Sequence, residues 1–334
     1  MVDTPQPVLM AMYGTKHGHA QGVFSVMLAN PDVEVVGVYE PDRSRRDELE
    51  ASEDGPWSMV RWLDDPADIL EDPSIVAVAS EGDNAESLAH TEAIVEAGKH
   101  AFYDKPAGED LPRFERVLAS AREQSLLVQM GYMFRYNDGF ARIAEWARSG
   151  FFGNVYSIRS HMSTNVGADS HGRLAQHKGA IFYDLAGHTL DQIVWILGRP
   201  HKITSFLRTE LAETPGFVDN SVAVFEFDSA TAIIEIAAME PKPPARRFEV
   251  YGDAGSAILD PMEPATTLRL CLTEAKGGFP KGVSTVELEA RPRYIASLAA
   301  FVEDVRGNKT ADRTLDHEFL VQETLLRATG AVGG

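Results

Sequence analysis

Two polar residues interrupt an apolar segment between Gly179 and Asp191. Asp184 and His188 stand four residues apart, a spacing that places two side chains on one face of a helix within mutual reach. A carboxylate can orient an imidazole and stabilise its charged form, which suits a general acid or base near neutral pH. Because the surrounding residues are largely apolar, a buried helix here must give the polar pair a partner or a function. The pair is therefore either an acid–base pair or a buried His–Asp contact that only supports the fold.

A lysine follows another short apolar run, in the tetrapeptide Tyr103-Asp104-Lys105-Pro106. Ligands of open parallel sheets bind at the carboxyl ends of the strands. A lysine held at such an end by a following proline is well placed to polarise a hydroxyl or carbonyl oxygen. The alternative is a surface lysine beside a turn.

A turn rich in glycine and histidine joins the first predicted strand to the first predicted helix. It consists of Gly14, Thr15, Lys16, His17, Gly18 and His19. A dinucleotide fingerprint, G-x-G-x-x-G, belongs at this place. Gly14 matches the tight-turn glycine, whereas Lys16 and His19 stand where the second and third glycines are expected. Lys16 can supply charge to a phosphate or block its approach, and a shifted turn at Gly18 can compensate. Because no cysteine or acidic residue accompanies the two histidines locally, we expect no metal.

An acidic residue, Glu40, ends the second predicted strand. A carboxylate there accepts hydrogen bonds from a ribose 2′-hydroxyl and repels a 2′-phosphate, which favours NAD over NADP. Three arginines just after it weaken this preference, so NADP stays open. They are Arg43, Arg45 and Arg46.

Strands and helices alternate through the first third of the chain. We expect strands at 8–13, 33–39, 75–79, 100–103 and 126–131, and helices at 20–29, 45–53, 66–70, 85–97 and 111–124. Repeated strand–helix units of this length predict a doubly wound parallel sheet, as in a Rossmann fold. Residues 1–130 are accordingly predicted to form a dinucleotide-binding domain.

The regular alternation of strands and helices ends at about residue 131. Strands are expected at 155–162, 201–210, 221–228, 231–239, 247–251, 257–259, 267–273 and 285–289, and helices at 140–149, 179–197, 294–306 and 315–328. Neighbouring strands with short links predict an antiparallel sheet. The fold class is thus α/β, with an α+β domain at 131–334 built on a large, mostly antiparallel sheet. The polar stretch 163–178 is expected to be a loop.

Composition restricts the possible partners. The formal net charge of −19 argues against nucleic acid and anionic membranes. No apolar run approaches the ~20 residues needed to cross a bilayer. The single cysteine, Cys271, rules out an internal disulfide and fits a cytoplasmic protein. Met1 to Pro7 contain no basic residue, so we expect no signal peptide.

The order of the motifs resembles the Gfo/Idh/MocA oxidoreductases, named for glucose–fructose oxidoreductase and inositol dehydrogenase. That family combines a glycine turn with AGKHV-x-x-EKP, G-x-x-x-R-[FY], G-x-[LF]-G and GG-x-x-x-D-x-G-x-H-x-x-D. The corresponding segments here are 97–106 (AGKHAFYDKP), 131–136 (GYMFRY), 150–153 (GFFG) and 179–191, followed by 250–256 (VYGDAGS). The resemblance covers nearly the whole chain, with departures at Asp104 for Glu and at Ala180 and Ala186 for glycines.

The resemblance implies an NAD(P)-binding Rossmann domain and a second domain whose sheet often forms the oligomer interface, as in a homodimer or homotetramer. It implies a catalytic group of Lys105, Asp184 and His188. The predicted cofactor-binding set is the turn Gly14 to His19 together with Glu40, Asn84 and Lys105, although Asn84 lacks the Thr-Pro that usually precedes it.

The implied reaction is hydride transfer between nicotinamide and a secondary alcohol or ketone of a sugar, cyclitol or related polyol. His188 would be the general base, Asp184 its orienting partner, and Lys105 the group that polarises the reacting oxygen. Four residues in or beside 163–178 are the predicted substrate contacts: His161, Asn165, Arg173 and His177.

Two other functions stay open. The degenerate glycine turn suits a cofactor-poor relative that binds a metabolite as a regulator. A metal cluster for hydrolysis is the third possibility, although no H-E-x-x-H motif supports it. Its ligands would be His161, His171, His177, Asp184 and His188.

Overall fold

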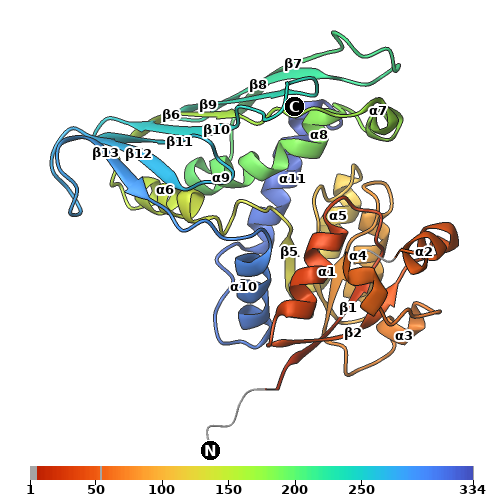
Figure 1. The fold of residues 1–334 in the computed structure, drawn as a ribbon. Coiled ribbons are helices and arrows are strands. Elements are labelled where there is room, and N and C mark those ends of the chain that lie inside the picture. Colours follow the sequence, from red (N-terminus) through yellow and green to blue (C-terminus); the bar gives the residue numbers. More distant parts are fainter. Residues whose placement is uncertain (1–5, 53–54, 334) are drawn as a thin grey trace, which may run out of the picture. The chain divides into compact units, whose positions relative to one another are not determined.

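A parallel sheet organises the first part of the computed structural model, which describes residues 6–52 and 55–333 (Figure 1). Its five strands run in the order β2-β1-β3-β4-β5, and every pairing is parallel. The strands are β1 (Val8–Tyr13), β2 (Val33–Tyr39), β3 (Ala77–Ser80), β4 (His100–Tyr103) and β5 (Val128–Met130). The predicted Rossmann-type sheet is confirmed. Short apolar strands suit this position because helices cover both faces of a parallel sheet.

Helices pack on this sheet through their apolar faces. The helices are α1 (Ala20–Ala29), α2 (Arg43–Glu50), α3 (Ala67–Leu70), α4 (Ser87–Glu96), α5 (Leu111–Glu123) and α10 (Ile295–Val305), with a 3₁₀ turn at Gly55–Met59. Phe24 of α1 and Phe301 of α10 join the buried core beneath β1 and β4. Asp42 caps α2 by accepting hydrogen bonds from the backbone N–H groups of Ser44 and Arg45.

Contacts divide the chain into two units. The first consists of residues up to 131 together with 292–319, and the second of 132–291 together with 320–334. The segment 292–319, which carries α10, therefore packs with the parallel sheet, although the sequence-based boundary placed it in the second domain. The functional division into a cofactor-binding and a substrate-binding domain stays a prediction.

The second unit is built on an eight-stranded sheet in the order β13-β12-β11-β10-β6-β9-β8-β7. All its pairings are antiparallel except β6 with β9. The strands are β6 (Val155–His161), β7 (Lys202–Arg208), β8 (Asn220–Glu226), β9 (Thr231–Ala237), β10 (Arg247–Gly252), β11 (Gly255–Leu259), β12 (Thr267–Leu272) and β13 (Gly282–Glu287). The predicted α/β class with a large, mostly antiparallel second sheet is confirmed.

One face of this sheet carries helices, as Figure 1 shows for α6, α8 and α9. The second-unit helices are α6 (Asp138–Arg148), α7 (Ala168–Leu174), α8 (Ile181–Leu185), α9 (Gly187–Leu197) and the later part of α11 (Leu315–Thr329). The other face exposes three large apolar side chains, Tyr156, Phe206 and Val283. Burial therefore alternates along the strands, as expected when one face is packed and the other is open.

Two local features differ from the sequence-based expectation. The polar stretch 163–178 contains the short helix α7 rather than only loop. The segment expected as one helix from 179 to 197 is interrupted at Ala186, between α8 and α9. Ala186 keeps helical dihedrals (φ −63°, ψ −29°), and its N–H donates to Phe182 O while its C=O accepts from Leu190 N. The interruption is therefore small, and the chain stays helical between Asp184 and His188.

The N-terminal segment expected to carry no signal peptide lies partly outside the described residues, because positions 1–5 are not described. Among the helices at 6–52 and 55–333, none is long and apolar enough to cross a membrane.

Candidate active site

The turn after β1 adopts a backbone that requires glycine at its first position. Gly14 has φ +82°, and a Cβ there would lie 2.8 Å from the backbone nitrogen of Gly82. Both the dihedral and the close approach exclude larger residues. This tight turn lies where β1 and β3 end, and ligands of parallel sheets bind at that edge. The observed Gly14 geometry is the one that a dinucleotide fingerprint demands of its first glycine.

Glu40, the predicted ribose acceptor, is tied to this turn. Its Oε2 accepts hydrogen bonds from the backbone N–H and the hydroxyl of Thr15, at 2.7 and 2.6 Å. Its Oε1 accepts from the backbone N–H of Asp42 at 2.8 Å, and the residue is only 4% exposed. A carboxylate has about four acceptor positions, so Glu40 keeps capacity for one further donor. The contact with Thr15 also fixes the shape of the turn.

Lys16 stands at the position of the second fingerprint glycine and forms ion pairs with two acidic side chains. Its Nζ lies 3.0 Å from Asp42 Oδ2 and 3.0 Å from Glu86 Oε1. Partial burial opposes the charge, but the hydrogen bonds to Glu86 and Asp42 outweigh it and raise the pKa of Lys16. Its positive charge is thus balanced within the protein, and the surroundings of the turn are acidic.

His17 and His19 both contact Asp104, the residue before Lys105. The Nδ1 atoms of His17 and His19 lie 3.2 and 2.9 Å from Asp104 Oδ2. Burial opposes the charge of Asp104, but the two histidines outweigh it and hold the pKa of that carboxyl well below its usual range. Burial lowers the pKa of His19, and Asp104 only partly opposes that effect. Sequence reasoning missed this contact because 85 residues separate His19 from Asp104.

A second carboxylate, Glu81, faces the same cluster. It is fully buried, and its Oε2 lies 3.7 Å from His17 Nδ1. Its carboxyl group also interacts with the side chain of Asp104. Burial and the nearby Asp104 raise the pKa of Glu81 well above its ordinary value. Sequence reasoning did not single out Glu81, although it directly follows β3 at the ligand-binding edge of the sheet.

Among the other predicted residues of the first unit, Lys105 and Asn84 are buried, whereas Gly18 is exposed. Lys105 is 3% exposed, and its charge is close enough to lower the pKa of both Glu81 and His19. Its backbone N–H donates to Asp104 Oδ1 at 2.7 Å. Asn84 is buried just before α4. The structure therefore groups Lys105 with the histidine–carboxylate cluster.

In the second unit, aromatic rings surround His188. The imidazole is fully buried on α9, with the rings of Phe134 and Tyr132 at centroid distances of 5.7 and 6.5 Å. Asp184 on α8 is half-buried. A histidine enclosed in this way holds a fixed ring orientation, which a general base requires.

A buried ion pair links α9 to the segment before α6. Arg135 Nη2 donates to Asp191 Oδ1 at 2.7 Å, and Gln192 Nε2 donates to Asp191 Oδ2 at 2.9 Å. Both charged side chains are at most 1% exposed. Arg135 is the arginine of the G-x-x-x-R motif, and Asp191 is the last aspartate of the 179–191 motif. These two motifs were the features of the sequence that could have indicated the pair.

Family models match most of the chain. One for the NAD-binding Rossmann fold of an oxidoreductase family covers residues 9–132, and one for the Gfo/Idh/MocA C-terminal domain covers 140–258. The chain belongs to the Gfo/Idh/MocA oxidoreductase family. It is accordingly an oxidoreductase with an NAD-binding Rossmann domain, as the motif order predicts.

Characterised relatives of this family include inositol dehydrogenases. The chain is 28% identical over 293 residues to the scyllo-inositol 2-dehydrogenase (NAD(+)) of Bacillus subtilis, covering 84% of this chain and 81% of that protein. It is 24% identical over 254 residues to the myo-inositol 2-dehydrogenase of Thermotoga maritima, with 73% and 74% covered.

Solved structures share the whole fold. GenD2 from gentamicin A biosynthesis, solved with NAD, matches with a TM-score of 0.80 at 21% identity, covering 98% of this chain and 94% of GenD2. The UDP-N-acetylglucosamine 3-dehydrogenase GnnA of Acidithiobacillus ferrooxidans matches with a TM-score of 0.80 at 17% identity, covering 98% of each chain.

The backbone is strained just before α8, at the start of the motif that contains His188. Gly179 has φ +89°, and Ala180, at a position where the Gfo/Idh/MocA motif has a second glycine, has φ +41°. A side chain disfavours that backbone conformation. The alanine at this position therefore adds backbone strain.

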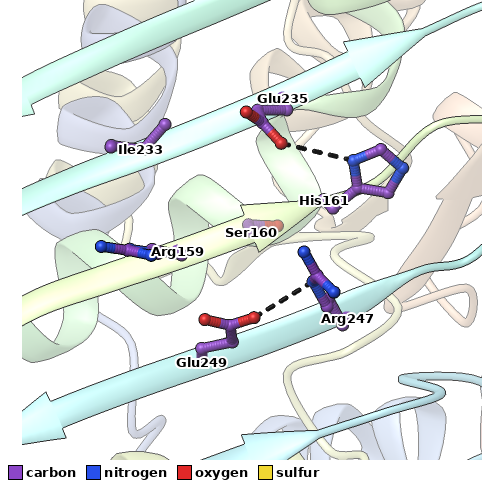
Figure 2. A pocket seen from close by; sticks show the side chains of 7 residues that line it. All are labelled: Arg159, Ser160, His161, Ile233, Glu235, Arg247 and Glu249. Atoms are coloured by element: carbon purple, nitrogen blue, oxygen red, sulfur yellow. Dashed lines mark ion pairs between the residues drawn. The ribbon is translucent and has the colours of Figure 1, made fainter.

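The four predicted substrate contacts lie in different surroundings. His161 lines a pocket on the sheet beside Arg159, Glu235 and Arg247, where Figure 2 shows its ion pair with Glu235 at 3.5 Å. Its Nε2 also contacts Glu240 at 2.9 Å.

The other three belong to the stretch 163–178. Asn165 and Arg173 are exposed. His177 is buried and stacks on Tyr183 at a centroid distance of 4.8 Å. Exposure therefore favours Asn165 and Arg173 as contacts for a polar ligand.

The hydrolase-type metal cluster considered for the second unit is not assembled. Over 6–52 and 55–333, the one group of three potential ligands close enough to hold an ion is His17, His19 and Asp104. That group lies in the first unit and contains none of the five residues considered.

Proposed function

We propose that this protein is an NAD-dependent dehydrogenase that transfers a hydride between nicotinamide and a secondary alcohol or ketone of a sugar, cyclitol or related polyol. One observation supports this proposal most strongly. Lys105, Asp184 and His188 stand at the motif positions of a family whose members include inositol dehydrogenases.

The roles follow from side-chain chemistry. His188 removes the hydroxyl proton as the carbon is oxidised, Asp184 orients the imidazole and stabilises its charge, and Lys105 polarises the reacting oxygen. The nicotinamide, when bound, supplies the hydride chemistry. The enclosing rings of Tyr132 and Phe134 support the assignment of His188, since they hold its ring in one orientation.

The residues of the turn fit a dinucleotide. Gly14 supplies the tight turn, and Glu40 retains acceptor capacity for a ribose hydroxyl. Asp42 and Glu86 add negative charge beside Lys16. This acidic setting disfavours a 2′-phosphate, so we propose NAD as the preferred cofactor. We propose Asn165 and Arg173, together with His161 and His177, as substrate contacts.

A substrate panel with matched variants tests the function. Reduction of NAD⁺ by the purified protein is followed with scyllo-inositol, myo-inositol and a set of aldoses. On the best substrate, Lys105→Ala and His188→Ala should each lower kcat by about 10²–10⁴-fold, whereas His201→Ala, an exposed histidine, should not. Near wild-type turnover in either variant would contradict the catalytic role proposed for that residue.

Cofactor titration separates the regulatory alternative. Nicotinamide fluorescence should report NADH binding by the wild-type protein. Absence of binding at millimolar cofactor would favour the cofactor-poor regulator over the dehydrogenase.

We also propose a homodimer or homotetramer formed through the open face of the eight-stranded sheet, in the cytoplasm. Exposed Tyr156, Phe206 and Val283, on β6, β7 and β13, support the interface, because association would remove large apolar side chains from water. The single, unpaired thiol of Cys271 supports a reducing compartment.

A further inference from the structure

We propose that His17, His19 and Asp104, with Glu81 as a fourth ligand, bind a divalent transition-metal ion of the zinc type. Sequence reasoning expected no metal, because no acidic residue lies near the two histidines in the chain. The fold supplies two, at the ends of β3 and β4. The proposal is independent of the dehydrogenase function: it uses the histidine side chains and leaves the backbone of the turn to a cofactor.

The spacing of the ligand atoms suits one ion. One nitrogen from each histidine and one oxygen of Asp104 all lie within 4.8 Å of one another. Asp104 Oδ2 is 2.9 Å from His19 Nδ1 and 3.2 Å from His17 Nδ1. In a tetrahedral zinc site with metal–ligand bonds of about 2.1 Å, neighbouring ligand atoms stand roughly 3.4 Å apart. The two observed distances to Asp104 Oδ2 are close to that value.

One ring nitrogen of His17, Nδ1, faces both Asp104 Oδ2 at 3.2 Å and the backbone N–H of His19 at 3.2 Å. A metal ion at this place would take the Nδ1 lone pair that accepts the hydrogen bond from His19. The short His17–His19 spacing, with one residue between, lets a single turn present both rings.

Glu81 is the second, independent observation. Its carboxyl group is fully buried beside the Asp104 carboxyl group, and Oε2 is 3.7 Å from His17 Nδ1. Two carboxylates buried together are costly unless a cation lies between them. A metal bound by the other three residues would supply that cation.

The donor set selects the kind of ion. Two imidazoles and two carboxylates form a mixed nitrogen and oxygen set, which suits Zn²⁺ and its neighbours Co²⁺, Fe²⁺ and Mn²⁺. Ca²⁺ and Mg²⁺ prefer oxygen ligands alone. Copper(I) prefers thiolates, and the chain's single cysteine lies on β12 in the second unit. The two carboxylates balance the charge of a divalent ion.

Metal titration of the full chain tests the site. Tag-free protein is stripped with a chelator, transferred to chelator-free buffer, and titrated with Zn²⁺ against a chromophoric indicator and with Co²⁺ by visible absorption. We expect one equivalent of either ion and the d–d bands of a low-coordinate Co²⁺ site. His17→Ala, His19→Ala and Asp104→Asn should each weaken Zn²⁺ binding on the order of 100-fold, whereas His201→Ala should bind as wild type.

The outcomes separate the metal site from a purely hydrogen-bonded cluster. Circular dichroism establishes that each variant is folded, so that a single unfolded variant leaves the others to decide. Failure of the folded wild-type protein to bind Zn²⁺ or Co²⁺, or equal binding by the three ligand variants, would overturn the proposal. An unchanged Co²⁺ spectrum in Glu81→Gln would overturn the assignment of Glu81 as fourth ligand, and an altered spectrum would support it.

Discussion

Arg135 and Asp191 form an ion pair in the core of the second unit, with Nη2 and Oδ1 2.7 Å apart and neither side chain more than 1% exposed. Asp191 lies on α9 three residues after His188, and Arg135 comes from the segment that also carries Phe134, a neighbour of the His188 ring. The pair therefore joins the two segments that orient the proposed general base. It is a positioning element, since neither residue is assigned to the reacting atoms.

Removing one charge of this pair should be strongly destabilising. Asp191→Leu removes one buried charge that pairs with the Arg135 guanidinium, and we expect a loss of about 3–5 kcal/mol in the free energy of unfolding. Urea unfolding measures it. The matched control is Lys202→Ala, which breaks an exposed pair with Glu226 and should cost less than about 1 kcal/mol. An Asp191→Leu variant as stable as the control would contradict the buried-pair interpretation.

Restoring glycine at position 180 should stabilise the protein. Ala180 has φ +41°, a conformation that costs a non-glycine residue roughly 1–3 kcal/mol. Glycine removes that strain but makes the unfolded chain more flexible, so we expect a net gain of about 1 kcal/mol for Ala180→Gly. Denaturant titration checks the sign. Ala175→Gly, at φ −65°, is the control and should lose stability.

Asp219 should make part of the stability depend on acid pH. Its carboxylate accepts backbone N–H bonds from Glu210, Leu211 and Ala212 at 2.8, 2.9 and 2.8 Å. Burial alone would raise its pKa, but these donors outweigh burial and lower it. A lowered folded-state pKa stabilises the fold above the unfolded-state value of about 3.9, and this stabilisation is lost as pH falls through the folded-state value.

Asp219→Asn should therefore cost about 1–2 kcal/mol at pH 7, and the difference from wild type should shrink below about pH 4. Urea unfolding at a series of pH values measures the difference. Asp228→Asn, on a fully exposed side chain, serves as the comparison. A constant difference between wild type and Asp219→Asn across the acid range would show that the charge of Asp219 is not responsible.

The open sheet face should carry the oligomer interface. Phe206 and Tyr156 are 59% and 54% exposed on β7 and β6, and glutamate at either position would place charge in an apolar contact. Light scattering after size-exclusion chromatography should show a smaller assembly for Phe206→Glu and Tyr156→Glu. Leu211→Glu, at a side chain that is 73% exposed and outside the strands, should keep the wild-type mass. If the wild-type protein is a monomer, the proposed oligomer interface is wrong.

Local patterns in the sequence determined the elements. The apolar runs 8–13 and 33–39 are the observed β1 and β2, and Asn30-Pro31 ends α1 as expected, because strand and helix propensity, caps and turns act over a few residues. The order of these elements was enough for a parallel sheet followed by a larger antiparallel one. The sequence motifs also indicated Lys105, Asp184 and His188 as candidate catalytic residues.

Only the tertiary structure brought distant residues together. His19 meets Asp104 because β1 and β4 belong to one parallel sheet and end at the same edge, and Glu81 joins them from β3 between the two. Arg135 meets Asp191 in the same way, across 56 residues. No local pattern marks such pairs, since side-chain periodicity records which face of an element is buried and carries no record of the partner that buries it. The sequence by itself therefore determined the elements and the candidate chemistry, and the packing of those elements decided which charges share a site.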